Sequence, residues 1–205
     1  MDEAPLSPEA SLSLIDEEQQ AAHRHLDFDP AIFLVPWGLA WLVGYGVLFL
    51  RFGPDERVLV SMPEWMPYLL LYVPLVAAGA VSGVAGHRAT QGIAGESADR
   101  GRMYGWSWAV AFAGFGVFGS AFHAYLPDPQ FRLLMSALPV FITGILYMSG
   151  GAVWRDRHQF AFGVWLSLIN AAGLLAGPGW HSLIISLLGG GGMLASAAYQ
   201  RARRP

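Results

Sequence analysis

The chain has 205 residues, of which 54% are hydrophobic and 13% are charged, and its net charge is −3. This composition is typical of an integral membrane protein and not of a soluble domain. The chain contains no cysteine, which excludes disulfides, thiolate catalysis, iron–sulfur clusters and cysteine zinc sites.

The first thirty residues are polar and acidic. They lack the basic start and apolar core of a cleaved signal peptide, so we expect the first transmembrane helix to be retained. Within this segment, Ser7-Pro8-Glu9 has the pattern of a helix start, with a capping serine, a first-turn proline and an acid. Residues 1–30 are therefore predicted to form a cytoplasmic segment with a short helix, and Asp29-Pro30 to begin the first span.

Six apolar stretches follow, each near the roughly 20 residues that a helix needs to cross a bilayer. They predict an all-α membrane protein with six transmembrane helices over residues 31–199 and a basic cytoplasmic tail over 200–205. The predicted spans are Ala31–Leu50, Tyr68–Gly86, Tyr104–Tyr125, Leu133–Val153, Phe160–Ala176 and Ser182–Tyr199.

The orientation follows from the basic residues, all twelve of which are arginine. Cytoplasmic loops of membrane proteins collect arginine and lysine. With both termini inside, nine arginines are cytoplasmic and only Arg51, Arg57 and Arg132 lie outside. An odd number of helices would place the C-terminal arginine cluster outside. We therefore expect a multi-pass protein of a bacterial cytoplasmic membrane with both termini in the cytoplasm.

The helices also suggest three repeated hairpins. Odd-numbered spans begin with glycine near tryptophan, as in Trp37-Gly38 and Gly105-Trp106, and even-numbered spans end in small residues and arginine. Hairpins repeated in one orientation occur in some transporters. The alternative is that any membrane hairpin with an inner arginine shows this pattern.

Small residues recur at helical spacing on several spans. Such faces let helix backbones approach closely in lipid, so they predict packing within the chain or between copies, with a pore wall as the alternative. Four consecutive glycines, Gly189–Gly192, weaken a helix and predict a tight crossing or a bend. The glycines expected to pack are Gly79, Gly83, Gly86, Gly116, Gly189 and Gly192.

The sequence offers little chemistry. No Asp, Glu, Lys or Arg lies in the middle of a span, which argues against transport driven by an intramembrane carboxylate. The glycine-rich stretches lack the context of a nucleotide-binding loop. His123 and His181 lie at outer helix ends near the depth of Asp128, where they are either a metal or pH-sensing pair or ordinary interfacial residues. We expect no catalytic residues, no metal, no cofactor and no enzymatic activity.

Two segments carry a family resemblance, Pro36-Trp37-Gly38-Leu39-Ala40-Trp41 and Gly163-Val164-Trp165-Leu166, together with the all-arginine composition. From about Asp29 onward the chain resembles a group of uncharacterised actinobacterial six-helix membrane proteins that are often labelled as transporters. The resemblance implies a multi-pass protein and brings no functional residues. Small bacterial amide and urea channels are similar in helix count and length only.

Two functions are open from the sequence. The first is a small-solute transporter or channel with polar contacts from Asn170, Ser167, Ser82 and Thr143, of which Asn170 is expected to point inward because lipid cannot satisfy its amide. The second is a non-transporting subunit or sensor that binds a partner through its arginine-rich cytoplasmic face. The expected partners are the lipid bilayer, a second copy or another membrane protein; the C-terminal arginines suit lipid headgroups, and no nucleic acid is expected.

Overall fold

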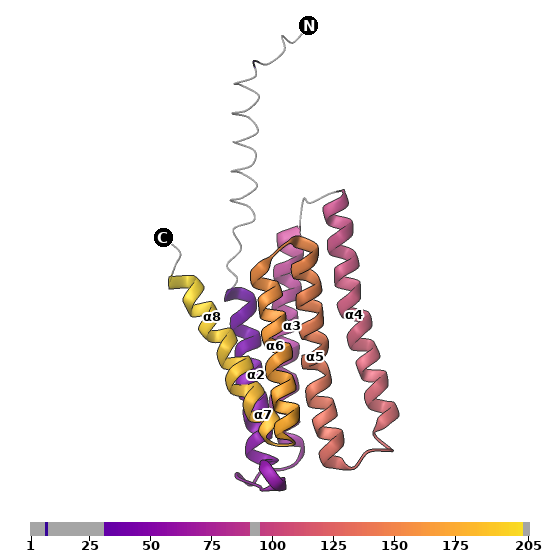
Figure 1. The fold of residues 1–205 in the computed structure, drawn as a ribbon, viewed down its shortest axis with the longest axis vertical. Coiled ribbons are helices and arrows are strands. Elements are labelled where there is room, and N and C mark those ends of the chain that lie inside the picture. Colours follow the sequence, from indigo (N-terminus) through magenta and orange to yellow (C-terminus); the bar gives the residue numbers. More distant parts are fainter. Residues whose placement is uncertain (1–6, 8–30, 91–94, 203–205) are drawn as a thin grey trace.

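The computed structural model describes Ser7 and residues 31–90 and 95–202, and these residues form an all-α bundle (Figure 1). The short N-terminal helix predicted over residues 1–30 lies outside the described residues, as do residues 203–205 of the predicted basic tail. The elements are α2 (Ala31–Arg51), η1 (Pro54–Glu56), α3 (Trp65–Thr90), α4 (Glu96–Phe122), α5 (Asp128–Trp154), α6 (Arg157–Ala176), α7 (Trp180–Ile184), η2 (Ile185–Gly190) and α8 (Gly191–Ala202).

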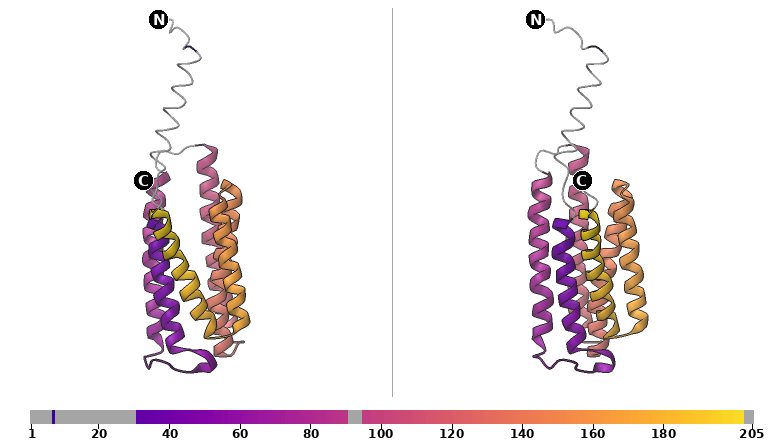
Figure 2. Two further views of the ribbon diagram at one scale, coloured as in Figure 1. Left: turned by 60° about the vertical axis from the view of Figure 1, so that its left-hand side comes forward. Right: turned by 90° about the vertical axis from the view of Figure 1, so that its left-hand side faces the viewer.

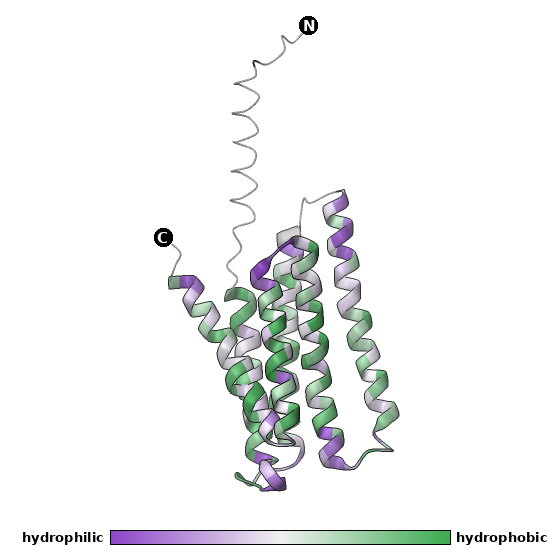
Figure 3. Ribbon diagram, in the orientation of Figure 1, coloured by the Kyte–Doolittle hydropathy of each residue, from purple (hydrophilic) through white to green (hydrophobic). Residues whose placement is uncertain are grey.

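Within the described residues, six helices are long and apolar enough to cross a membrane, with α7, η2 and α8 together forming the sixth. The predicted fold class and number of spans are confirmed. Figure 3 shows hydrophobic residues along the middle of the helices and hydrophilic residues gathered at their ends. This is the distribution that a bilayer requires.

The start of α2 and the end of α8 lie at the same end of the bundle, which we call the terminus end (Figures 1 and 2). The opposite end, called here the pocket end, carries the connections over residues 52–64, 123–127 and 177–179. An even number of spans places the start of α2 and the end of α8 on the same side, as the orientation inferred from the arginines requires.

The helices pack unequally. α2 packs closely on α3 and also on η2 and α8, while α5 packs closely on α6. α4 packs mainly on α5, and only 6% of its most apolar window is buried, so most of its surface suits lipid. The three hairpins suggested by the sequence are therefore not packed alike, and the repeat remains a pattern of the sequence.

Glycines set the close packing of α5 on α6. A Cβ added at Gly163 would lie 2.6 Å from the carbonyl oxygen of Gly144, and one added at Gly151 would lie 2.5 Å from the backbone nitrogen of Phe160. The hairpin between these helices is fixed by Asp156, whose side chain caps α6 by accepting hydrogen bonds from two backbone N–H groups. The face of α6 that carries Gly163 thus meets α5 at close range.

Replacing Gly163 by alanine is expected to lower the free energy of unfolding by about 1–3 kcal/mol, because the new methyl group must displace the backbone of α5. Gly83→Ala is the matched control, since a Cβ there meets no atom within 4 Å and alanine favours helix. Unfolding in mixed detergent micelles would measure both. A Gly163→Ala protein as stable as wild type would show that the two helices are not in this contact.

Candidate functional site

A cavity of about 430 Å³ opens at the pocket end. Its walls come from the ends of α2 and α4, the starts of α3 and α5, the loop after α2 and the turn before α7. The lining residues fall into three stretches of the chain, 48–72, 123–136 and 178–182, which the fold brings together. The residues that line it are Leu48, Phe52, Glu56, Glu64, Tyr68, Leu71, Tyr72, His123, Asp128, Phe131, Arg132, Leu133, Met135, Ser136, Pro178, Gly179, His181 and Ser182.

The turn before α7 reaches the cavity because of glycine. Gly179 has a φ of 83°, a left-handed conformation that glycine adopts without strain. A Cβ added there would lie 2.5 Å from the carbonyl carbon of Gly53. The turn over residues 177–179 therefore rests directly on the end of α2, and this contact closes one side of the cavity.

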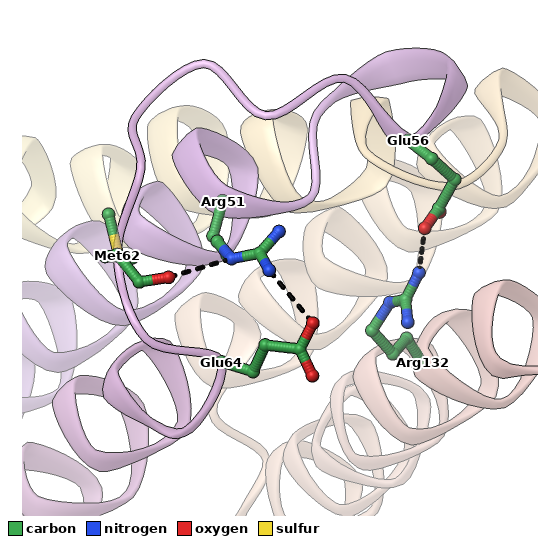
Figure 4. A network of polar contacts seen from close by, with 5 residues as sticks. All are labelled: Arg51, Glu56, Met62, Glu64 and Arg132. Atoms are coloured by element: carbon green, nitrogen blue, oxygen red, sulfur yellow. Dashed lines mark hydrogen bonds and ion pairs between the residues drawn. The ribbon is translucent and has the colours of Figure 1, made fainter.

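Two arginines hold the mouth of the cavity (Figure 4). Arg51 donates to the carbonyl oxygen of Met62 at 3.1 Å and pairs with Glu64 at 2.9 Å. Arg132 pairs with Glu56 across the mouth. The Arg51–Glu64 pair ties the end of α2 to the far end of the following loop, and the Arg132–Glu56 pair ties that loop to the start of α5.

Both guanidinium groups also contact one aromatic ring. The Cζ atoms of Arg51 and Arg132 lie 4.9 Å and 4.5 Å from the ring centroid of Phe52, within the range of a cation–π interaction. The loop itself carries strain, because Asp55 and Glu56 have φ values of 56° and 59°, at about 1–3 kcal/mol each. The arginine contacts stabilise a loop whose backbone is unfavourable.

The floor of the cavity is a buried chain of polar side chains. His181 is 1% exposed and Asn170 is 2% exposed. Nε2 of His181 lies 2.9 Å from Oδ1 of Asn170, and Nδ1 lies 3.1 Å from the hydroxyl of Ser136. Asn170 then donates through Nδ2 to the carbonyl oxygen of Ala137 at 3.1 Å. Side chains on α5, α6 and α7 are joined in this way.

The donor and the acceptor of each hydrogen bond in this row of buried side chains follow from elimination. Because Nδ2 of Asn170 is spent on the carbonyl of Ala137, its Oδ1 faces His181, and an amide oxygen only accepts. The hydrogen of the neutral imidazole therefore lies on Nε2, and Nδ1 accepts from the hydroxyl of Ser136. Every buried side-chain nitrogen and oxygen of the described residues has a partner, so the floor is rigid.

α2 supports the floor from the other side. The hydroxyl of Tyr45 donates to the carbonyl oxygen of Ser136 at 3.1 Å, and its ring meets the ring of His181 edge to face, with centroids 6.5 Å apart. Tyr45 is itself buried against Trp41. Four helical elements thus converge on the histidine.

The last span departs from α-helical geometry just below the floor. Residues Ile185–Gly190 form a π-helical turn, after which α8 resumes with ordinary α-helical geometry. Ser186 in this turn donates to the carbonyl oxygen of Leu42 at 2.7 Å. Single π-turns inside α-helices are frequent at functional sites.

The glycine run forms the predicted tight crossing with α2. A Cβ added at Gly189 would lie 3.0 Å from the ring of Trp41, and one added at Gly190 would clash with the backbone at Leu42. Gly192 is less crowded, with the nearest atom, on Trp165, 3.5 Å away.

The glycine stripe on α3 and Gly116 on α4 differ from the sequence expectation. A Cβ added at Gly79, Gly83, Gly86 or Gly116 would meet no described atom of another element within 4 Å. Among the described residues, a side chain at these positions would therefore not enter a close helix contact. Packing between molecules and a pore wall remain as predictions for this face.

The four residues expected along a solute path are each bonded elsewhere. Asn170 points inward and bonds across helices, as expected. Ser167 and Thr143 donate to carbonyl oxygens of their own helices at 2.9 and 2.7 Å, and Ser82 accepts from the indole of Trp37 at 2.9 Å. None of the four is among the described residues that border the 430 Å³ cavity.

The two outer histidines do share one site. His123, His181 and Asp128 all line the cavity, but His123 packs its ring against Phe131, with centroids 5.0 Å apart. Over residues 31–90 and 95–202 no group of three or more His, Asp or Glu side chains is placed to hold a metal ion. The shared depth predicted from the sequence is real, whereas the structure supplies no metal-binding arrangement for the pair.

The mouth of the cavity was not predicted from the sequence. The sequence did indicate it, because Arg51 and Arg132 are two of the three arginines on the side where the charge bias leaves few arginines. An arginine that runs against the bias needs a local partner, and each of these has a carboxylate and an aromatic ring.

Six helices that are long and apolar enough to span a bilayer define the class, a multi-pass α-helical membrane protein, here with a cavity at one end of the bundle. No family model, no curated protein and no solved structure matches the chain. The six-helix architecture agrees with the resemblance noted from the sequence, and no family is identified.

Proposed function

We propose that the protein is a transporter or channel for a small polar solute, and that the cavity at the pocket end receives this solute. The observation that carries the proposal is the cavity itself. Its volume of about 430 Å³ lies in the range of small-molecule sites, and it reaches from the loops at the pocket end to His181, which is buried inside the bundle. The role involves no chemical step.

The π-helical turn in the last span supports movement of solute beyond the floor. Single π-turns inside α-helices are frequent at functional sites. Here the π-helical turn Ile185–Gly190 follows α7 directly, and α7 carries His181. A shift of α7 would open the floor.

The arginine bias assigns the pocket end to the outside of the cell and the terminus end to the cytoplasm. The solute then enters from the outside, and the mouth formed by Arg51, Arg132 and their partners is the first part of the protein that it meets.

Uptake into proteoliposomes tests the proposal. Purified protein would be reconstituted and offered radiolabelled choline, alanine, glycerol and acetate, one probe for each charge class. We expect one class to enter faster than into protein-free liposomes, with saturation. If a correctly folded preparation accelerates none of the four, and native membranes instead yield a stoichiometric protein partner, the non-transporting subunit is the better account.

The subunit alternative has less support from the described charges. Two of the arginines on its proposed binding face, Arg100 and Arg102, pair with Glu96 and Asp99 on the same turns of α4. Their charge is partly neutralised within the chain, which weakens the face as a site for an acidic partner.

A further inference from the structure

The cavity has an excess of negative charge. Its lining includes the carboxylates of Glu56, Glu64 and Asp128 but only one guanidinium, that of Arg132. Glu56 pairs with Arg132, and Glu64 pairs with Arg51 just behind the wall. The side-chain carboxylate of Asp128 makes no ion pair or hydrogen bond with any residue in the described part of the chain. One carboxylate charge therefore faces the cavity uncompensated.

The arginines are poorly placed to hold an anion. Arg132 is committed to Glu56 and to the ring of Phe52, and Arg51 is committed to Glu64 and to a backbone carbonyl. An anionic ligand would have to displace one of these carboxylates while it approached a third. The charge balance of the site opposes such a ligand.

Besides the carboxylate, the cavity walls supply aromatic and apolar surface that suits an organic cation. Aromatic side chains line the cavity from α3, α5 and the end of α2, namely Tyr68, Tyr72, Phe131 and Phe52. The rings of Phe52 and Tyr68 lie close, with centroids 6.0 Å apart. Aromatic faces attract cations through their quadrupole, and they favour methylated ammonium groups, which are weakly hydrated. Leu48, Leu71 and Met135 add apolar surface suited to the methyl groups.

We infer that the ligand of this cavity is a small organic cation of the methylated ammonium class, held by the carboxylate of Asp128 and by the rings of Tyr68, Tyr72 and Phe131. The inference builds on the proposed function by naming the class of solute. A free metal cation fits less well, because it would find one uncompensated carboxylate and aromatic carbon where it needs a shell of oxygen atoms.

Binding to the purified full-length protein tests the inference without any need for transport. The probes are benzyltrimethylammonium, its uncharged carbon isostere neopentylbenzene, and phenylacetate as an anion of similar size, measured by isothermal titration in detergent. We expect the cation to bind at least about tenfold more tightly than either of the others. Absence of cation binding, equal affinity for the isostere, or a preference for phenylacetate would overturn the inference.

Variants locate the binding. Asp128→Asn is expected to weaken cation binding about tenfold and to leave the isostere unaffected, and Tyr68→Leu to weaken the cation by a similar factor. Asp99→Asn and Tyr125→Leu are the matched controls, because Asp99 lies near the terminus end and Tyr125 is 81% exposed outside the lining. Cation affinity that falls equally in the control variants, or does not fall in Asp128→Asn, would contradict the assignment.

The transport role and the ligand class can be overturned independently of each other. If the cation binds in detergent but no probe crosses proteoliposomes, the ligand class stands and the transport role falls. If a neutral or anionic probe is taken up and the cation does not bind, transport stands and the ligand class falls.

Discussion

Replacing Asn170 by leucine is expected to lower the free energy of unfolding by about 2–4 kcal/mol. The substitution removes two buried hydrogen bonds and leaves the Nε2–H of His181 without a partner. A buried polar group left unsatisfied costs about 1–3 kcal/mol, although bonds between membrane helices are individually weaker, at about 0.6–2 kcal/mol. Unfolding in mixed micelles measures the change.

A double-mutant cycle separates this bond from general packing. Asn170→Leu and His181→Leu together should cost less than the sum of the two single changes, because in the double variant neither of these two side chains leaves the other with an unsatisfied polar group. Ser120→Ala serves as the control, since Ser120 is exposed on α4 and bonds only within its own helix. Additive costs in the cycle would show that the two side chains are not bonded.

The outcome also decides the role of Asn170. The sequence left two roles open, a bond between helices and a contact with solute. The geometry favours the first, because both ends of the amide are already bonded inside the protein. If Asn170→Leu stays fully stable yet loses uptake, the amide is instead a solute contact.

Filling the cavity is expected to stop uptake. Ser182 lines the cavity beside His181 and is only half-buried, so Ser182→Phe adds a ring to the solute space without entering the close contacts between helices. We expect uptake per folded molecule to fall by more than about tenfold, because a solute in this space would have to displace the ring. The assay is proteoliposome uptake of whichever probe the wild type transports.

Ser107→Phe is the matched control for this variant. Ser107 is exposed on α4 and donates only to a carbonyl of the same helix, so the same substitution there adds a ring on the surface that suits lipid. Uptake that survives Ser182→Phe, or that Ser107→Phe abolishes equally, would contradict the placement of the solute in the cavity.

The architecture was largely predictable from the sequence. Each span in the structure overlaps an apolar stretch of sufficient length, because lipid forces the chain to satisfy its backbone inside helices. The inward direction of Asn170 followed from the same argument. The small-residue face of α6 was also recognisable, since Gly163 and Ser167 share one helix face and that face meets α5.

The cavity could not be predicted in the same way. Periodicity shows which residues share a helix face and does not show what that face meets. The glycine stripe on α3 was therefore expected to pack, although a Cβ added at Gly79 or Gly83 meets no described atom within 4 Å. The cavity residues come from distant segments, such as Phe52, Tyr68, Arg132 and His181, and only the tertiary structure joins them. The sequence signals of the site were the shared depth of His123, His181 and Asp128 and the two arginines, Arg51 and Arg132, that run against the charge bias.

The most direct test of the account is the accessibility of a single cysteine in the cavity. The chain has no cysteine, so Ser182→Cys in otherwise unchanged protein gives one reactive thiol. In vesicles of known orientation, the account predicts that an impermeant maleimide reacts from the pocket-end side, that the transported solute slows this reaction, and that reaction from the terminus side becomes measurable during uptake. A thiol that reacts from the pocket-end side at one rate with and without solute, and never from the terminus side, would contradict a solute-transporting cavity.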